Sequence, residues 1–289
     1  MKEIVKEKIA SLLSGDEEIQ SVEQLGGMTN QNYLVKTSSN QYIVKFFGKG
    51  TDKLIDRQNE KFNLELLKDL KLDVENYLFD IEAGIKVNQY IENAETLDSA
   101  TIKTKFEKIA PILQTIHASG KELKGEFAPF EEIKKYESLI QGEISYPNYE
   151  AVRKSVLSLK NELEKIGIEK KSCHIDLVPE NFIEGPDGHL YLIDWEYSSM
   201  NDPMWDLAAL FLESEFTPDE EDSFLSYYES EQTPVSREKI RIYKILQDII
   251  WSLWTIYKEE NGADFGDYGI TRYNRAVKEL QSQGGIDED

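Results

Sequence analysis

The chain has 289 residues, of which 40% are hydrophobic and 30% are charged, and this balance is typical of a soluble globular protein rather than a disordered or fibrous one. Its formal net charge of −22 argues against binding to nucleic acid or to an anionic membrane, because both partners require a basic surface. The one cysteine, Cys173, excludes an internal disulfide and is typical of a reducing compartment.

The N-terminal residues MKEIVKEKIA mix charged and apolar side chains and contain no continuous apolar region, so they do not resemble a secretory signal. No stretch of the sequence approaches the roughly 18 apolar residues that a membrane-spanning helix needs. We therefore expect a cytoplasmic protein without membrane insertion.

The first third of the chain has the pattern of a small sheet with helices. Apolar residues recur at helical spacing near the N-terminus, at Val5, Ile9 and Leu12. Residues 32–37 and 42–47 alternate apolar and polar side chains, which predicts a β-hairpin. A helix should follow, and residues 84–91 should form another strand. The apolar residues expected on the inner side of that helix are Leu54, Phe62, Leu66 and Leu70.

Helical periodicity dominates the rest of the chain, for example at Val152, Val156 and Leu159. The exception is residues 171–194, where two short apolar strands flank a turn at residues 185–188. The sequence therefore predicts an α+β chain with two lobes. A small β-rich N-terminal lobe is expected over residues 1–91, and a mainly helical C-terminal lobe over residues 92–289.

The stretch HIDLVPEN, residues 174–181, lies between a predicted strand and a hairpin whose second strand ends at Asp194. Asp176, Asn181 and Asp194 could therefore converge, and two carboxylates with an amide oxygen suit Mg²⁺. The spacing matches the kinase arrangement H-x-D-x-x-x-x-N followed by a metal-binding aspartate. An isolated H-x-D is a weak indication, but the combination favours a functional site. We assign His174 itself a scaffold role, in which it bonds to the backbone.

A kinase also needs a phosphate-covering loop, a strand lysine and a helix glutamate in its N-terminal lobe. The segment GGMTNQN, residues 26–32, lies between two predicted strands, and its glycines allow a close backbone approach to phosphates. Lys45 ends the strand YIVK on the face opposite to Val44, and Glu60 on the following helix could pair with it. Each feature alone is common, and neither G-x-G-x-x-G nor a GK[ST] loop is present. Their order along the chain agrees with a kinase.

Two motifs carry a family resemblance: CHIDLVPEN, residues 173–181, and LIDWEYSSMNDPMWDLA, residues 192–208. They resemble the catalytic loop and the following signature of the choline kinases, within the group of small-molecule kinases that includes aminoglycoside phosphotransferases. The likeness is greatest to the bacterial Lic-type choline kinases. The second motif is the more specific, because aminoglycoside kinases share its aspartate but lack the Trp-Glu-Tyr-Ser continuation.

The resemblance implies a bilobal protein-kinase-like fold that uses ATP and Mg²⁺. It implies that Asp176 is the catalytic base and that Asn181 and Asp194 bind Mg²⁺. It also implies that Lys45 pairs with Glu60 to position the phosphates.

The resemblance further implies nucleotide contacts at the family hinge, residues 88–91, and in the glycine-containing loop. Backbone groups of the hinge would bind adenine, and the residues concerned are Gln89, Tyr90 and Ile91. The loop candidates are Thr29, Asn30 and Asn32. Here the sequence departs from the protein-kinase glycine pattern, which leaves the individual contacts of the loop open.

Choline carries a quaternary ammonium that cannot donate N–H hydrogen bonds, so a selective pocket needs aromatic faces and nearby negative charge. Trp251 and Trp254 share a helix face, Tyr197 follows the metal aspartate, and Glu213 ends the segment DLAALFLE. The resemblance places all four at or beside the choline site. Without it, aromatic residues at helical spacing would indicate core packing.

We therefore expect ATP and choline to react to phosphocholine and ADP. Two alternatives stay open: a kinase for another small alcohol, such as ethanolamine or an aminoglycoside, and a pseudokinase that binds nucleotide as a regulatory module. A metallohydrolase has little support, because His117, His174 and His189 are the only histidines. Choline is the expected small-molecule partner, no nucleic-acid partner is expected, and the oligomeric state stays open.

Overall fold

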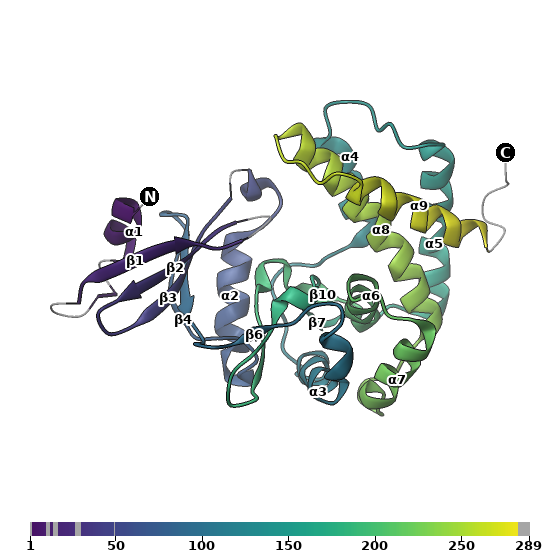
Figure 1. The fold of residues 1–289 in the computed structure, drawn as a ribbon. Helices are drawn as coiled ribbons and strands as arrows, with labels where there is room; N and C mark the ends of the chain where they lie inside the picture. The colour runs from purple at the N-terminus through teal and green to yellow at the C-terminus, as the bar shows by residue number, and fades with distance from the viewer. Residues whose placement is uncertain (1, 10–11, 14–16, 27–29, 49, 283–289) are drawn as a thin grey trace.

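The computed structural model describes residues 2–9, 12–13, 17–26, 30–48 and 50–282. The N-terminal strands lie at one side of the molecule and the helices from α3 onward at the other, with α2 between them (Figure 1). The predicted combination of a β-rich N-terminal lobe and a mainly helical C-terminal lobe is confirmed. The division after residue 91 stays a prediction.

The N-terminal lobe is built on a five-stranded antiparallel sheet with the order β1-β2-β3-β5-β4. Its strands are β1 (Ile19–Gln24), β2 (Gln31–Thr37), β3 (Gln41–Phe46), β4 (Asn76–Asp80) and β5 (Ile85–Gln89). The predicted hairpin is formed by β2 and β3. Because strand side chains alternate, Val35 and Val44 lie on the face that packs against Val5 and Ile9 of α1 (Lys2–Ile9). The neighbouring side chain of Lys45 therefore points to the opposite face.

Helix α2 (Arg57–Leu67) borders that opposite face (Figure 1). Leu66 packs against the main core as expected, and so does Leu70 just beyond the helix. The expectation that Phe62 lies on the inner side is wrong, because Phe62 is 40% exposed. Instead, the buried positions of α2 include the polar Arg57 and Glu60. The N-terminal half of this side of the helix faces ion pairs, whereas Leu67 joins the apolar core, and hydrophobic periodicity does not reveal the charged part.

The C-terminal lobe gathers its helices around one large hydrophobic core. The long helix α8 packs against α9, α6 and α4. The helices are α3 (Phe106–His117), α4 (Pro129–Leu139), α5 (Tyr149–Ile166), α6 (Pro203–Glu213), α7 (Pro218–Tyr228), α8 (Arg237–Glu260) and α9 (Tyr268–Gln281). Short 3₁₀ turns are η1 (Thr51–Lys53), η2 (Lys68–Leu70), η3 (Ile102–Thr104), η4 (Pro179–Asn181) and η5 (Trp195–Tyr197).

Two small sheets frame the segment that contains HIDLVPEN. Strand β7 (Lys171–Cys173) pairs with β10 (Ser199–Asn201), and β8 (Phe182–Glu184) lies between β6 (Glu95–Thr96) and β9 (Leu190–Leu192). The predicted pair of short strands around residues 185–188 is thus confirmed as β8 and β9. Strand β7 leads into the loop with Asp176, and strand β9 leads to Asp194 and η5, which contacts α2.

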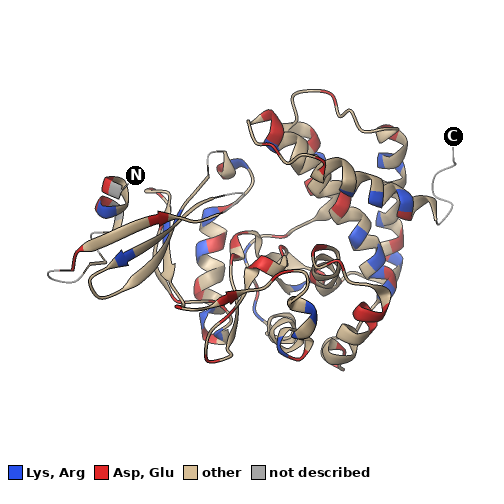
Figure 2. Ribbon diagram, viewed as in Figure 1, with Lys and Arg blue, Asp and Glu red and all other residues tan. Residues whose placement is uncertain are grey.

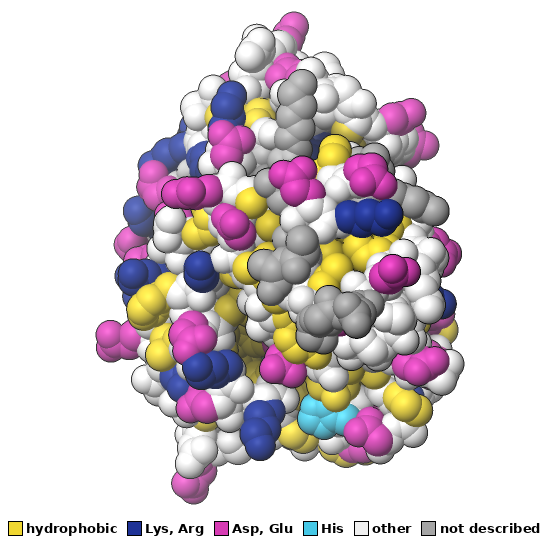
Figure 3. Space-filling model, turned by 90° about the vertical axis from the view of Figure 1, so that its left-hand side faces the viewer, with side chains coloured by type: hydrophobic (Ala, Val, Ile, Leu, Met, Phe, Trp, Pro, Cys, Tyr) yellow, Lys and Arg dark blue, Asp and Glu magenta, His cyan; other side chains and the backbone are white. Residues whose placement is uncertain are grey.

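Acidic and basic residues are interspersed along the helices of both lobes (Figure 2). On the face shown in Figure 3, carboxylates alternate with lysines and arginines, and apolar side chains show between them. Among the described residues, no helix combines the length and the apolar character needed to cross a bilayer. A cytoplasmic location stays a prediction from the sequence.

Candidate active site

The loop that begins with His174 is anchored by the buried carboxylate of Asp206 on α6. Its two oxygens accept hydrogen bonds from the backbone N–H groups of His174 and Ile175, at 2.8 Å each. Ile175 has a left-handed φ of 78°, a conformation that costs energy for a β-branched residue and therefore needs such support. His174 Nε2 lies 2.9 Å from the carbonyl oxygen of Ile193, as expected for a scaffold residue. Helix α6 and strand β9 thus hold the backbone immediately before Asp176.

Backbone contacts bring Asp176, Asn181 and Asp194 together. The side-chain Nδ2 of Asn181 donates to the Asp176 carbonyl oxygen at 2.9 Å. The N–H of Ile193 donates to the Asn181 carbonyl oxygen at 2.8 Å, so Asn181 lies beside the residue that precedes Asp194. With Nδ2 engaged, Asn181 has its amide oxygen left to offer a ligand. Carboxylates and an amide oxygen are the donor set that Mg²⁺ prefers, so these residues fit that ion.

Acidic neighbours change the ionisation of Asp176. Burial, followed by the charges of Asp194, Glu213 and Glu196, raises the pKa of Asp176 to about 8, and Arg272 opposes the shift. These groups come from three different segments, so Asp176 lies within electrostatic reach of all of them. A carboxylate with a pKa near neutral is better suited to accept a proton than an ordinary one.

Lys45 reaches across from the sheet and donates to Asp194 Oδ1 at 2.7 Å. Burial by itself would raise the pKa of Asp194, but Lys45 and Lys86 outweigh it and hold that pKa below its usual range. Asp194 therefore stays ionised in this position. It adopts a left-handed φ of 65° between β9 and η5.

The expected direct pair of Lys45 with Glu60 is not formed among the described residues. Glu60 instead accepts from Lys86 Nζ at 2.9 Å and from Arg57 Nη1 at 2.6 Å. The physical reason lies in the sheet register: Lys86 of β5 is directly opposite Lys45 of β3, so both lysines reach the same side. Lys86 therefore forms the ion pair with Glu60, and Lys45 pairs with Asp194 instead.

Asn30 has a different environment from the one expected of a phosphate-covering residue. Its Nδ2 donates to Glu196 Oε2 at 2.7 Å, and its Oδ1 accepts from Arg57 Nη2 at 3.1 Å and from the Gly48 N–H at 3.2 Å. Arg57 also donates to Glu196 at 2.9 Å. The side chain of Asn30 thus ties the loop to α2 and η5, and a phosphate contact through this side chain would require that network to open.

The other loop candidates differ in what the structure reveals. Asn32 Nδ2 donates to the Gly26 carbonyl oxygen at 2.9 Å, which closes the base of the loop. Thr29 lies outside the described residues. The roles of Asn32 and Thr29 in nucleotide binding stay predictions.

The hinge candidates begin at Gln89, the last residue of β5, which pairs with Tyr42 of β3. The Gln89 N–H donates to the Glu75 carbonyl oxygen at 2.8 Å, and the Ile91 carbonyl oxygen accepts from Ala94 at 3.3 Å. Gly185, in the turn between β8 and β9, approaches so closely that a Cβ there would lie 3.4 Å from Ile91 Cγ2. The segment Gln89, Tyr90 and Ile91 therefore joins the sheet to the catalytic strands, the position that a hinge requires.

The predicted acceptor residues belong to a run of ring contacts that we call the aromatic arc. Ring centroids are 5.8 Å apart for Tyr197 and Trp251, 6.4 Å for Trp251 and Trp254, 5.0 Å for Trp254 and Phe265, and 6.4 Å for Phe265 and Tyr268. The arc starts three residues after Asp194 and ends at the first residue of α9. The structure therefore brings Tyr197, Trp251 and Trp254 together, as predicted.

Glu213 lies at the far end of the arc. Its Oε1 accepts from Arg272 Nη2 at 2.6 Å, and Arg272 Nη1 donates to the Tyr268 hydroxyl at 2.8 Å. Asp176 lies within range of its charge, because Glu213 contributes to the raised pKa of Asp176. The arrangement surrounds the approach to Asp176 with aromatic faces and one carboxylate.

The sequence interpretation missed four residues of this region: Lys86, Phe265, Tyr268 and Arg272. Lys86 could have been found, because it lies on the same side as Lys45 if the strand at residues 84–91 pairs with the strand before it. Phe265 and Tyr268 follow the tryptophan-bearing helix at a spacing of three, which is a weaker signal. For Arg272 the sequence offered no signal, because its partners come from distant segments.

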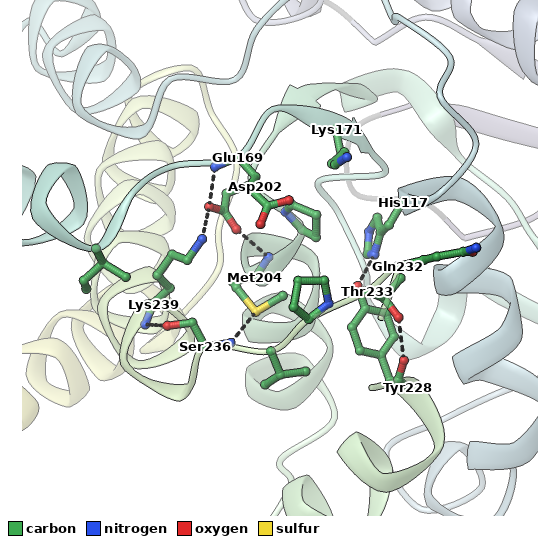
Figure 4. A pocket seen from close by; sticks show the side chains of 14 residues that line it. His117, Glu169, Lys171, Asp202, Met204, Tyr228, Gln232, Thr233, Ser236 and Lys239 are labelled. Atoms are coloured by element: carbon green, nitrogen blue, oxygen red, sulfur yellow. Dashed lines mark hydrogen bonds and ion pairs between the residues drawn. The ribbon is translucent and has the colours of Figure 1, made fainter. Parts of the chain in front are cut away.

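A separate cavity of about 210 Å³ is lined by residues that include His117, Asp202 and Lys239 (Figure 4). His117 lines it and contacts Asp206 Oδ2 at 3.0 Å and the Tyr228 hydroxyl at 2.8 Å. Lys239 and Asp202, also in its wall, pair at 2.8 Å. Figure 4 shows the Asp202–Lys239 pair in the wall, and none of the predicted site residues lines this cavity.

A smaller cavity, of about 140 Å³, does include predicted residues. Glu60 and Tyr197 line it, together with Glu196. It opens between α2 and the segment around α4, where Lys124 and Lys135 contribute to the wall. The groove between the lobes therefore borders both the ion pairs and the start of the aromatic arc.

Comparison with known proteins identifies the family. Residues 22–239 match the model of the choline/ethanolamine kinase family. Protein LicA of Haemophilus influenzae is 30% identical over 268 residues, which span 89% of this chain and 79% of that protein. The crystal structure of choline kinase LicA from Streptococcus pneumoniae is 76% identical, with a TM-score of 0.94 over 98% of this chain and 99% of that one.

A further solved structure shows LicA in complex with AMP. It is 77% identical to this chain, with a TM-score of 0.92 over 97% of this chain and 98% of that one. These likenesses extend over both lobes and confirm the protein-kinase-like architecture implied by the motifs. The family model covers the loop of Asp176, Asp194 and most of the N-terminal sheet, and the chain therefore belongs to the choline/ethanolamine kinase family.

Proposed function

We propose that the protein transfers the γ-phosphoryl group of ATP to the hydroxyl of choline, with phosphocholine and ADP as products. The observation that carries this proposal is that Asp176 lies within electrostatic reach of Asp194 and also of Tyr197 and Tyr268, which belong to two unlike walls. One wall is the ion pair of Lys45 with Asp194. The other is the aromatic arc, which begins at Tyr197. The choline kinase that is 76% identical to this chain supports the same reaction.

The nucleotide belongs on the side of Lys45. Its ammonium, now paired with Asp194, can attract phosphate oxygens in a protein of strongly negative net charge. Asn181 and Asp194 would hold Mg²⁺, which when bound supplies positive charge to the phosphate oxygens. The AMP complex of the LicA relative supports a nucleotide site in this fold. Backbone groups at Gln89, Tyr90 and Ile91 would bind adenine.

Asp176 orients the choline hydroxyl and accepts its proton while the oxygen bonds to phosphorus. Only the ionised carboxylate can do so, and a pKa raised to about 8 makes that carboxylate a stronger base than an ordinary aspartate. The anchor at Asp206 fixes the backbone on which Asp176 is carried. Most of the rate enhancement is then positioning and electrostatic stabilisation, because phosphoryl transfer needs little covalent chemistry from the enzyme.

The trimethylammonium group would lie against the aromatic arc. Trp251 and Trp254 offer ring faces to a cation without N–H donors, and Glu213 offers negative charge. Ethanolamine has a primary ammonium that prefers several hydrogen-bond acceptors, whereas the indole faces of Trp251 and Trp254 supply none. We therefore favour choline over ethanolamine as the acceptor.

A coupled assay of ADP release tests the proposal with choline, ethanolamine and kanamycin as acceptors. We expect choline to give the highest kcat/KM, and Asp176→Ala to lower choline-dependent turnover by about 10³-fold. Faster turnover of ethanolamine than of choline would overturn the assignment of the pocket. ADP release that ignores all acceptors, or that persists in Asp176→Ala, would contradict the kinase mechanism.

A further inference from the structure

Arg272 joins three helices at the far end of the aromatic arc. This residue of α9 is 4% exposed. Its Nη2 donates to Glu213 of α6 at 2.6 Å and its Nη1 to the Tyr268 hydroxyl at 2.8 Å. Its Nε lies 3.3 Å from Asp248 Oδ1 of α8. One guanidinium therefore holds a carboxylate and an aromatic ring of the acceptor side.

A buried arginine beside a cation pocket calls for a physical explanation, because like charges repel. The explanation is Asp248, which is buried and pairs with Arg272 as well as with Arg275. Arg275 is 42% exposed, so water screens its charge. Glu213 and Asp248 both face the Arg272 guanidinium, so its positive charge is offset where it lies, and Arg275 reaches Asp248 from the more exposed side.

The geometry of the guanidinium explains why an arginine suits this place. Its planar fork can bind two partners at once in a fixed relative orientation, which a flexible ammonium cannot do. The guanidinium carbon also lies 5.1 Å from the centroid of the Tyr268 ring. Tyr268 is 38% exposed and would otherwise be free to turn away from Phe265. Arg272 thus determines where both Glu213 and Tyr268 are held.

We propose that Arg272 is a positioning residue that sets the preference for a cationic acceptor. It acts through Glu213 and Tyr268 and does not itself touch the acceptor. This inference rests on the proposed phosphorylation of choline. It goes further by assigning the selectivity for positive charge to a residue of α9, outside the segment matched by the family model.

The test compares two acceptors of equal shape and different charge: choline and 3,3-dimethylbutan-1-ol, in which carbon replaces the nitrogen. For each protein the ratio of their kcat/KM values is measured at saturating ATP. Arg272→Met should lower this ratio by about tenfold, mainly through a higher KM for choline, while the KM for ATP changes by less than about twofold. Because both acceptors are measured on one sample, the ratio does not depend on how much of the protein is folded.

Arg275→Met is the matched control. Arg275 lies on the same helix and binds the same Asp248 carboxylate, at 2.6 Å for each of two contacts, but it has no contact with Glu213 or Tyr268 among the described residues. We expect its ratio to stay within about twofold of the parent value. Arg272→Lys keeps the charge and loses the fork, so it should restore part of the ratio.

Equal losses for both acceptors in Arg272→Met, with an unchanged ratio, would overturn the inference, and so would the same fall in Arg275→Met. If Arg272→Met does not fold, the same ratio of kcat/KM values is measured for Tyr268→Phe. This variant keeps the ring and removes the hydroxyl that binds Arg272. A ratio about threefold below the parent value supports the proposal, and a parental ratio contradicts it. A parent protein that phosphorylates neither alcohol would instead contradict the proposed function, and this inference with it.

Discussion

The proposed nucleotide side and the proposed acceptor side of the site differ in the kind of side-chain contact that forms them. The nucleotide side contains buried ion pairs, in which Lys86 and Arg57 share Glu60 and Lys45 binds Asp194. The acceptor side consists of ring contacts from Tyr197 to Tyr268, with Glu213 and Arg272 at its far end and the Lys258 ammonium 5.7 Å from the centroid of the Trp254 ring. A polyanion requires fixed positive charge, whereas a cation without donor groups requires polarisable faces, so each wall fits the chemistry of its proposed ligand.

The contrast also concerns stability. A buried ion pair is costly to break, because removal of one partner leaves the other charge buried and alone. A ring that lines a pocket can be replaced by another apolar group with less effect on folding. Substitutions on the nucleotide side should therefore affect folding as well as ATP, and substitutions on the acceptor side chiefly choline.

Glu60→Gln should have the largest effect on stability. It leaves Lys86 and Arg57 without their shared carboxylate charge, and we expect a loss of about 3 kcal/mol in the free energy of unfolding, measured by urea denaturation. Glu65→Gln on the same helix is the control, because its pair with Lys68 is exposed. Equal stability of the two variants would show that the buried network contributes nothing.

Lys45→Met should reveal the nucleotide side in kinetics. Loss of the ammonium should lower kcat/KM for ATP by roughly 100-fold, since a charge-assisted contact to phosphate is worth about 2–3 kcal/mol. The KM for choline should change little. Lys36→Met, on the exposed position of the neighbouring strand β2, serves as the control. A parallel rise in both KM values would contradict the separation of the two walls.

Trp254→Leu is the converse experiment on the acceptor side. Loss of one indole face, worth on the order of 2 kcal/mol, should raise the KM for choline by roughly 30-fold and leave the KM for ATP nearly unchanged. Trp254→Phe retains an aromatic face and should lose much less. If Leu and Phe behave alike, the residue serves packing rather than cation binding.

The pH dependence of stability sharpens the comparison. Burial alone would raise the pKa of Glu60, but Lys86 and Arg57 hold it below its usual value of 4.5. A lowered pKa means that the stabilisation is complete above pH 4.5 and is lost as the pH falls through the lower folded-state value. The difference in unfolding free energy between the parent and Glu60→Gln should therefore be unchanged from pH 7 to about pH 4.5 and shrink as the pH falls below that value. A constant difference would indicate that the carboxylate charge is not its source.

Local spacing was enough to predict the centre of the site. The loop with Asp176 and Asn181 and the strand end with Asp194 lie close in sequence, so a short hairpin brings them together. The hairpin of β2 and β3 was predictable for the same reason, because the alternation of side chains sets its faces. The resemblance added the acceptor residues, whose rings do meet in the arc.

Partners at long range were not predictable in this way. Glu60 had two lysines on adjacent strands within reach, and the register of β3 with β5 gave it Lys86. Phe62 was expected inside because it is apolar, but the N-terminal half of the inner side of α2 faces charges. In both cases a neighbouring element, rather than the local sequence, decided the outcome.

From the amino acids alone one could derive the two-lobed architecture and the convergence of Asp176, Asn181 and Asp194, since hydrophobic periodicity and short-range spacing act within single segments. The pairing of Glu60 with Lys86 depends on the register of β3 with β5 against α2. The closure of the aromatic arc by Phe265 and Tyr268 and the contact of Arg272 with Glu213 arise only when α6, α8 and α9 pack together. Such contacts depend on the packing of helices distant in sequence, and periodicity within one helix carries no information about which side chain lies opposite.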